Sequence, residues 1–218
     1  MKYKIEWSYK RKGKSPVIFY SEWIASEEVI ELGEEIEKSG KATDLFFYDE
    51  IGTSWTLKDM KKLTVEVEEE PHDITVYFDG GYNEATKLAG VGAVIYYKEG
   101  KKKYRIRANE KFSDIHSNNE AEYAAFYFAV HLLEELGVHN MVCEFKGDSQ
   151  VVLKQLEGEW PCYEEEFNRW LDRIEAKLKS MGIESRYTSI LRKDNKEADK
   201  LATQGLEGKM INSKMQII

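Results

Sequence analysis

The feature that most constrains the fold is the order of apolar patterns after Pro71. Three strand-like segments come first, near residues 74–78, 90–98 and 102–108, and a short turn at Gly100 separates the last two. The patterns that follow lie near residues 117–136 (helix), 140–146 (strand), 149–156 and 163–181 (helices), 184–191 (strand) and 195–206 (helix). The predicted order is βββαβααβα, which is typical of an α/β domain.

A domain boundary is predicted close to Pro71. Residues 65–73 lose helical periodicity, are rich in glutamate and contain a proline before a new apolar strand. A chain of 218 residues is long enough for one full domain and one small domain. We therefore expect a small α+β N-terminal domain at 1–70, a larger α/β domain at 73–206 and a C-terminal tail at 207–218.

The N-terminal domain is predicted to be a ββαβ unit followed by a short helix. Its aromatic residues favour a compact core, and the alternative is a base-stacking platform beside the basic run at 10–14. We expect this domain to contact the substrate or a protein partner without taking part in the chemistry. The predicted strands are Lys2–Tyr9, Pro16–Trp23 and Thr43–Tyr48, and the predicted helices are Ser26–Lys38 and Leu57–Leu63.

The chain carries a net charge of −8, with −5 in residues 1–70 and −3 in the remainder. A broad nucleic-acid-binding face is normally basic, so this charge argues against one. The charge is compatible with a carboxylate site that divalent cations neutralise when it works. No apolar run approaches the roughly 20 residues that cross a bilayer, and residues 1–6 lack the core of a signal peptide. We therefore expect a cytoplasmic protein without membrane contact.

Four acidic residues stand where predicted strands end or predicted helices begin. Asp79 follows the first strand of the larger domain, and Asp148 stands at a strand-to-helix junction, where open α/β sheets place their ligand sites. Glu122 follows a capping box that opens at Ser117, and Asp199 lies in the first turn of the last helix. Each acid also has a structural explanation, because turns, first helical turns and N-caps favour such residues. Taken singly, none of them identifies a function.

Taken together, four motifs occur in the order of the ribonuclease HI family: Phe78-Asp79-Gly80, Asn118-Asn119-Glu120-Ala121-Glu122, Gly147-Asp148-Ser149-Gln150 and Asn195-Lys196-Glu197-Ala198-Asp199-Lys200-Leu201-Ala202. The larger domain resembles that family, and the predicted element order agrees with the family fold. The resemblance implies a ribonuclease H-like mixed five-stranded sheet flanked by helices. It also implies an endoribonuclease that cuts the RNA strand of an RNA–DNA hybrid and leaves 5′-phosphate and 3′-hydroxyl ends.

The same resemblance implies that four acids are catalytic and bind two Mg²⁺ ions, with Mn²⁺ as an alternative: Asp79, Glu122, Asp148 and Asp199. Hard cations require several oxygen ligands, and two ions stabilise both the attacking and the leaving oxygen of a phosphoryl displacement. The resemblance also implies contacts with the minor groove and the 2′-hydroxyl groups. The implied substrate-binding residues are Gly80, Gly81, Asn119, Gln150 and Asn195.

The sequence departs from the family pattern in three places. Long members carry a basic handle between the two central helices, whereas Glu157–Pro161 is short and acidic. Arg192 and Lys193 stand where many members have a mobile histidine. The N-terminal domain lacks the glycine and proline signature of the small hybrid-binding domain that some relatives carry.

Two other functions stay open at this point. A non-catalytic ribonuclease H-fold protein would bind nucleic acid or act as an adaptor, although the presence of all four acids favours an enzyme. An exonuclease of the same fold carries Asp-x-Glu on its first strand, where this chain has Asp79-Gly80-Gly81.

Overall fold

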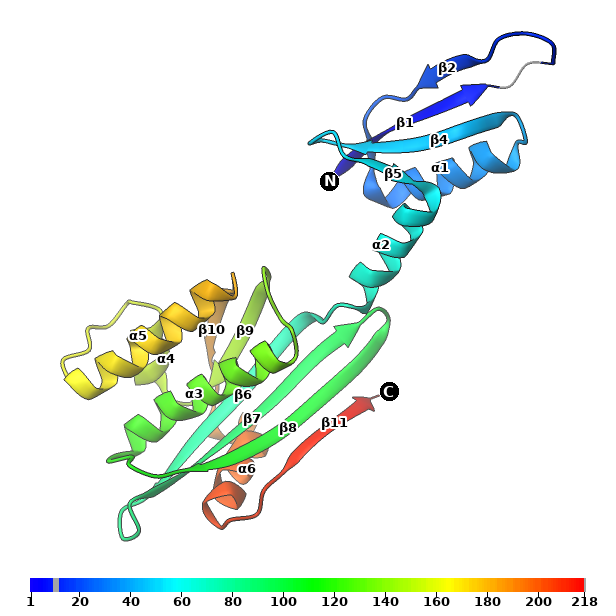
Figure 1. The fold of residues 1–218 in the computed structure, drawn as a ribbon. Helices are drawn as coiled ribbons and strands as arrows, with labels where there is room; N and C mark the ends of the chain where they lie inside the picture. Colours follow the sequence, from blue (N-terminus) through cyan, green and yellow to red (C-terminus); the bar gives the residue numbers. More distant parts are fainter. Residues whose placement is uncertain (10–11, 218) are drawn as a thin grey trace. The chain divides into compact units, whose positions relative to one another are not determined.

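The chain folds into two compact units, Met1–Glu69 and Glu70–Ile218, which are described separately (Figure 1). The structure is a computed structural model, and it describes residues 1–9 and 12–217, with the side chains of Glu27 and residues 65–69 excepted. Within these ranges, no helix combines the length and the apolar character that spanning a bilayer requires.

The first unit is an antiparallel sheet with a helix packed on it. The strands run in the order β2-β1-β4-β5, and β3 pairs with the start of β1. Helix α1 packs against β1 and β4 over a core of Tyr3, Ile5, Val29, Phe47, Leu57 and Met60. The elements are β1 (Lys2–Tyr9), β2 (Val17–Tyr20), β3 (Ile24–Ala25), α1 (Ser26–Lys38), β4 (Ala42–Asp49), β5 (Ser54–Thr56) and α2 (Leu57–Glu69).

The aromatic residues of the first unit do not all lie in its core. Phe47 is buried, but Phe19, Tyr20 and Trp23 are 44 %, 65 % and 43 % exposed. The expectation of a compact aromatic core is wrong for this region because β2 is an edge strand, and all of its residues are exposed. Residues 10 and 11, which begin the basic run of the base-stacking alternative, lie outside the described residues.

Helix α2 is longer than the sequence pattern predicts. The pattern favours a helix that ends near Leu63 and a non-helical segment at 65–73, but α2 continues to Glu69. Valine and glutamate lower helix propensity by less than about 1 kcal/mol each, so a helix that has begun can continue through them. It ends before Pro71, because proline disfavours the helical conformation of the preceding residue.

The second unit has a six-stranded sheet in the order β10-β9-β6-β7-β8-β11. Strands β6, β7 and β8 are antiparallel neighbours, whereas β9 and β10 run parallel to β6. Helices α3 and α5 lie on one face and α6 on the other (Figure 1). This is the mixed sheet that the family resemblance implies, with one strand added. The elements are β6 (His72–Asn83), β7 (Leu88–Glu99), β8 (Lys102–Phe112), α3 (Asn118–Glu135), β9 (Val142–Gly147), α4 (Gln150–Leu156), α5 (Glu165–Ser180), β10 (Glu184–Ser189), η1 (Arg192–Asp194), α6 (Lys196–Leu206) and β11 (Asn212–Ile217).

Strand β6 runs through the Asp79 motif instead of ending there. Asp79 pairs with Gly92, and the strand ends only at Asn83. The side-chain oxygen of Asn83 accepts hydrogen bonds from the backbone N–H groups of Ala85 and Thr86, which closes the hairpin to β7. The predicted strand end at Asp79 is therefore wrong, because the turn follows Asn83.

Two glycines let helices approach opposite faces of the sheet. A Cβ atom at Gly80 would lie 2.2 Å from the carbonyl oxygen of Ala121 in α3. A Cβ atom at Gly92 would lie 2.5 Å from the carbonyl oxygen of Ala198 in α6. Gly92 pairs with Asp79, so these two residues face the same side of the sheet. Gly80 follows Asp79 in the strand and therefore faces the opposite side. Helices α3 and α6 therefore pack on opposite faces of the sheet at the level of Asp79.

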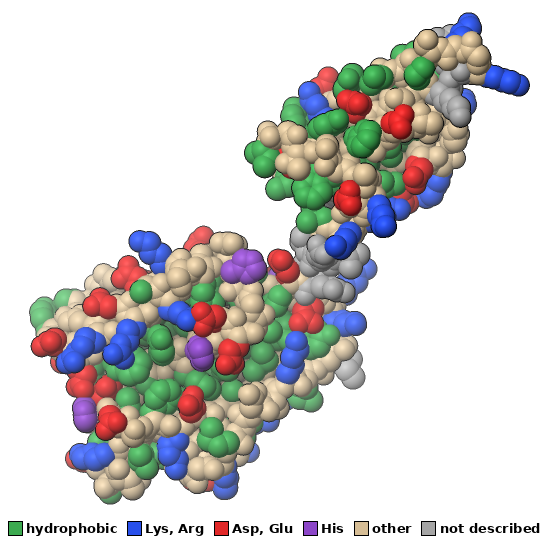
Figure 2. Space-filling model, in the orientation of Figure 1, with side chains coloured by type: hydrophobic (Ala, Val, Ile, Leu, Met, Phe, Trp, Pro, Cys, Tyr) green, Lys and Arg blue, Asp and Glu red, His purple; other side chains and the backbone are tan. Residues whose placement is uncertain are grey.

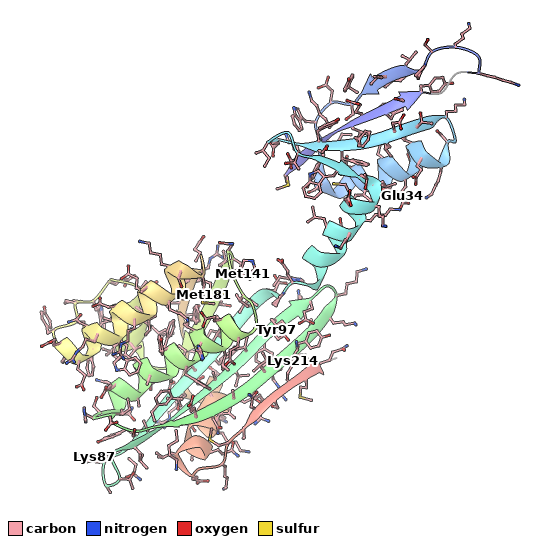
Figure 3. The ribbon with its side chains drawn as sticks, viewed as in Figure 1. Glu34, Lys87, Tyr97, Met141, Met181 and Lys214 are labelled. Atoms are coloured by element: carbon pink, nitrogen blue, oxygen red, sulfur yellow. The ribbon has the colours of Figure 1, made fainter. Side chains whose placement is uncertain are left out.

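The expected C-terminal tail at 207–218 is not a tail, because Asn212–Ile217 forms strand β11 along β8. The segment is short and largely polar, so its strand conformation depends on the free edge of β8. Lys214 of β11 lies over the ring of Tyr97, with its Nζ 5.3 Å from the ring centroid (Figure 3). The same Nζ forms an ion pair with Glu99 at 3.0 Å.

The side chain of Asn109, which is 3 % exposed, ties the segment before β11 and helix α6 to β8. Its Nδ2 donates to the carbonyl oxygens of Leu201 and Lys209 at 2.9 Å each. Its Oδ1 accepts a hydrogen bond from the backbone N–H of Ile211 at 2.7 Å. One buried amide thus joins three segments.

We expect Asn109→Ala to lower the free energy of unfolding by about 3 kcal/mol, at about 1 kcal/mol for each lost hydrogen bond. Urea denaturation measures this change. Lys103→Ala, at the exposed end of the same strand, is the control and should leave the midpoint nearly unchanged. An Asn109→Ala midpoint equal to that of the control would contradict the anchoring role.

Candidate metal centre

Carboxylates from three separate segments converge on one point. Asp79, Glu122 and Asp148 each offer an oxygen, and these oxygens lie within 4.8 Å of one another. Asp79 comes from β6, Glu122 from α3, and Asp148 from the junction between β9 and α4. The first two side chains are buried and the third is half-buried. Three of the four predicted acids therefore form one group, which we call the carboxylate cluster.

The start of α3 sets the position of Glu122. The Oγ atom of Ser117 accepts a hydrogen bond from the backbone N–H of Glu120 at 3.1 Å, as the capping box predicts. In return Glu120 accepts a hydrogen bond from the backbone N–H of His116 at 2.7 Å, one residue before the N-cap. With its start fixed and its backbone held against Gly80, α3 directs Glu122 toward β6.

Burial and mutual repulsion oppose full ionisation of the cluster. Burial, followed by the charges of Asp148 and Asp199, raises the pKa of Asp79 to about 8. Burial and the charges of Asp79 and Asp148 raise the pKa of Glu122 well above its ordinary value. In the described part of the chain no lysine or arginine forms an ion pair with the three carboxylates. Glu122 Oε2 is also buried, and no described residue hydrogen-bonds it. A hard divalent cation would relieve this repulsion, so the oxygen donors fit such an ion.

The fourth predicted acid, Asp199, lies outside the cluster in α6. Its Oδ1 forms an ion pair with Nη2 of Arg192 at 3.1 Å, and the Arg192 side chain is 82 % exposed. Exposed pairs contribute little to stability, so Asp199 can exchange this partner for another cation at low cost. Its charge still reaches Asp79, whose pKa it raises. The sequence pattern marked Arg192 only as a departure from the family and did not predict this contact.

Asn195 is not open to a substrate. Its side chain is 1 % exposed, and its Nδ2 donates to the carbonyl oxygen of Phe78 at 2.9 Å and to Oδ1 of Asp148 at 2.7 Å. The structure thus contradicts the expected substrate-binding role, because Asn195 begins α6 directly against β6. The capping explanation of Asp148 is also wrong, since Ser149 occupies the N-cap position of α4.

The other predicted substrate-binding residues differ in exposure. Asn119 and Gln150 are exposed in the first turns of α3 and α4. Gly80 is buried against α3, so its missing side chain serves helix packing rather than substrate approach. At Gly81, by contrast, no described atom lies within 4 Å of the Cβ position, and that stretch of backbone stays open.

Known proteins share both the sequence pattern and the fold. Residues 77–205 match the model of a family described as reverse transcriptase-like. The chain is 45 % identical to the uncharacterized protein YpeP of Bacillus subtilis (strain 168) over 214 residues, which are 98 % of this chain and 94 % of YpeP. It is 30 % identical to ribonuclease HI of Halobacterium salinarum over 135 residues, which are 62 % of this chain and 64 % of that protein.

Solved structures resemble the C-terminal part of the chain. RNase H1 from Halobacterium salinarum matches with a TM-score of 0.54 at 29 % identity and covers 62 % of this chain and 98 % of its own. LC11-RNase H1 in complex with RNA/DNA hybrid has the same TM-score and coverage at 23 % identity, which shows likeness of fold alone. Fold and carboxylate cluster thus define a ribonuclease H-like domain. The chain belongs to the ribonuclease H family, and membership supports ribonuclease H activity and the use of divalent metal ions at the level of the family.

The raised pKa of Asp79 predicts how the stability of the metal-free protein depends on pH. Below about pH 4 the Asp79 carboxyl is protonated in both the folded and the unfolded state. Between about pH 4 and pH 8 the unfolded state loses this proton while the folded state mostly keeps it. The free energy of unfolding therefore falls as the pH rises through this range. Asp79→Asn removes this loss. We expect it to raise the melting temperature by several degrees near pH 8 but little near pH 4.

Melting curves recorded in the presence of a chelator at both pH values measure this effect. Asp172→Asn, at an exposed position of α5, is the matched control and should not change the melting temperature at either pH. An Asp79→Asn protein that melts below the wild type near pH 8 would show that the cluster is not under repulsion.

Proposed function

We propose that this chain is an endoribonuclease that hydrolyses the RNA strand of RNA–DNA hybrids with divalent metal ions and leaves 5′-phosphate and 3′-hydroxyl ends. The observation that carries the proposal is the convergence of Asp79, Glu122 and Asp148 within 4.8 Å of one another. Two of these acids have raised pKa values, and acids with strongly shifted pKa values are typical of functional sites. Membership of the ribonuclease H family supports the same chemistry.

In this proposal the cluster and Asp199 hold two Mg²⁺ ions, with Mn²⁺ as an alternative. When bound, such ions would lower the pKa of the attacking water and stabilise charge on the departing 3′ oxygen. The protein's own contribution is to keep four carboxylates oriented from four separate segments. Asp199 would join the cluster by leaving Arg192, its exposed partner.

Recognition of the hybrid would depend on exposed side chains beside the cluster. Asn119 precedes Glu122 by three residues on the same face of α3, and Gln150 follows Asp148 by two residues. Both amides donate and accept hydrogen bonds, as do the 2′-hydroxyl groups that distinguish RNA from DNA. The open backbone at Gly81 would allow a phosphate to come close. The hybrid bound to LC11-RNase H1, a protein of the same fold, supports this class of substrate.

The net charge of −8 argues against a broad basic face that would hold the substrate. Figure 2 shows acidic and basic side chains interspersed over the visible surface. The segment that replaces the basic handle is engaged internally, since Lys154 pairs with Glu157 and Glu159 at 2.8 Å each. We propose that the first unit adds contacts to the substrate or to a protein partner through exposed residues such as Tyr20 and Trp23.

A non-catalytic adaptor of the same fold is less well supported. Carboxylates that are buried close together repel one another and lower the stability of the fold at neutral pH. A module that only binds nucleic acid would gain no function that offsets this loss of stability. It would also be expected to offer a larger basic surface than this chain does.

We expect Asp148→Asn to stop cutting while preserving binding of the hybrid. The amide keeps the size of the side chain and an oxygen that can accept from Asn195, but it lacks the negative charge that hard cations prefer. Cleavage of a labelled hybrid should fall by about 100-fold or more. Affinity in a gel-shift assay with Mg²⁺ should hold, because Asn119 and Gln150 are unchanged.

Asp172→Asn again serves as the control and should cut at the wild-type rate. Retained cleavage by Asp148→Asn would refute the proposed metal-ligand role. Lost cleavage together with a melting temperature many degrees below that of the wild type would instead indicate that Asp148 supports the fold.

A further inference from the structure

Asn195 makes a contact pattern that neither a surface residue nor a simple helix cap requires. Its Nδ2 carries two N–H groups and lies within hydrogen-bond distance of three acceptors, of which the nearest two are the carbonyl oxygen of Phe78 at 2.9 Å and Oδ1 of Asp148 at 2.7 Å. Oδ1 of Asp79 lies slightly farther away, at 3.4 Å. One amide at the start of α6 therefore contacts the backbone just before one cluster acid and the side chain of another.

We infer that Asn195 is the positioning residue of the carboxylate cluster, holding Asp148 at a fixed distance from β6 so that the two aspartates are spaced for a divalent cation. The inference rests on the metal site proposed above. The hydrogen bond to Phe78 holds the amide against β6. The hydrogen bond to Asp148 then fixes the loop after β9 relative to that strand.

The chemistry of an amide suits this task better than that of a charged donor. A lysine or arginine at the same place would satisfy Asp148 but would also cancel its charge and compete with a cation. The neutral amide occupies one lone pair and leaves the carboxylate anionic for a metal ion. Groups that hydrogen-bond a metal ligand commonly tune metal affinity in this way.

The stability of the fold alone does not explain why residue 195 is an asparagine. Its Oδ1 is buried and has no hydrogen-bond partner among the described residues, which opposes folding. A residue selected only to fill the space between β6 and α6 would avoid this orphan acceptor. The role of Asn195 therefore depends on the N–H groups of its amide, which face the carboxylates.

The test compares metal binding by Asn195→Ala and Asn109→Ala in the full-length protein. Both asparagines are buried and both anchor α6 to the sheet, but only Asn195 contacts a cluster acid. Binding of Mn²⁺ is followed by calorimetry and by the rise of the melting temperature with metal concentration. We expect both variants to melt below the wild type without metal. Only Asn195→Ala should need a higher half-saturating Mn²⁺ concentration, by about tenfold or more.

Asn195→Ser, which keeps one donor, provides the same comparison if the alanine variant does not fold, and it should lie between the wild type and alanine. Equal half-saturating concentrations for the Asn195 variants and Asn109→Ala would overturn the inference while leaving the metal site intact. A wild-type protein whose melting temperature does not respond to Mn²⁺ or Mg²⁺ would overturn the metal site and this inference together.

Discussion

Backbone packing of two helices on opposite faces of one strand pair is the constraint on which the second unit depends. Helix α3 meets the sheet at Gly80 and α6 meets it at Gly92, next to and opposite Asp79. Because backbone touches backbone at both points, a side chain added there would have to displace a helix. The helix positions in turn determine where Glu122 and Asn195 lie relative to Asp79, so the site geometry follows from close packing more than from the acids themselves.

The cluster that results is unfavourable on its own and is held by its surroundings. The ring of Phe126 in α3 packs against Phe78 at 5.1 Å and against Phe145 at 4.6 Å between centroids, so the core joins the strands on either side of the site. The same strands carry Asp79 and lead into Asp148. Apolar burial thus offsets the repulsion among carboxylates. A fold that keeps like charges together in this way is suited to a cation that binds after folding, at some cost in stability without it.

Much of the fold could be predicted because the apolar periodicity after Pro71 is strong and the turns are short. The four acids could be predicted because their motifs occur in a family order, and the structure brings three of them together. Other features depend on distant partners that no local pattern reveals. Strand β11 takes its conformation from the edge of β8, and β6 continues through Asp79 because β7 pairs with it. Likewise, the burial of Asn195 depends on where α6 lies.

The central claim is that this chain cuts RNA in a hybrid and needs a divalent cation to do so. Incubation of the wild-type protein with an RNA–DNA hybrid labelled on the RNA strand tests it most directly, with Mg²⁺, with Mn²⁺ and with a chelator, and with duplex RNA and duplex DNA as controls. We expect RNA fragments with 5′-phosphate and 3′-hydroxyl ends from the hybrid alone, and none in the chelator. An intact hybrid in both metals, or cutting that the chelator does not stop, would contradict it.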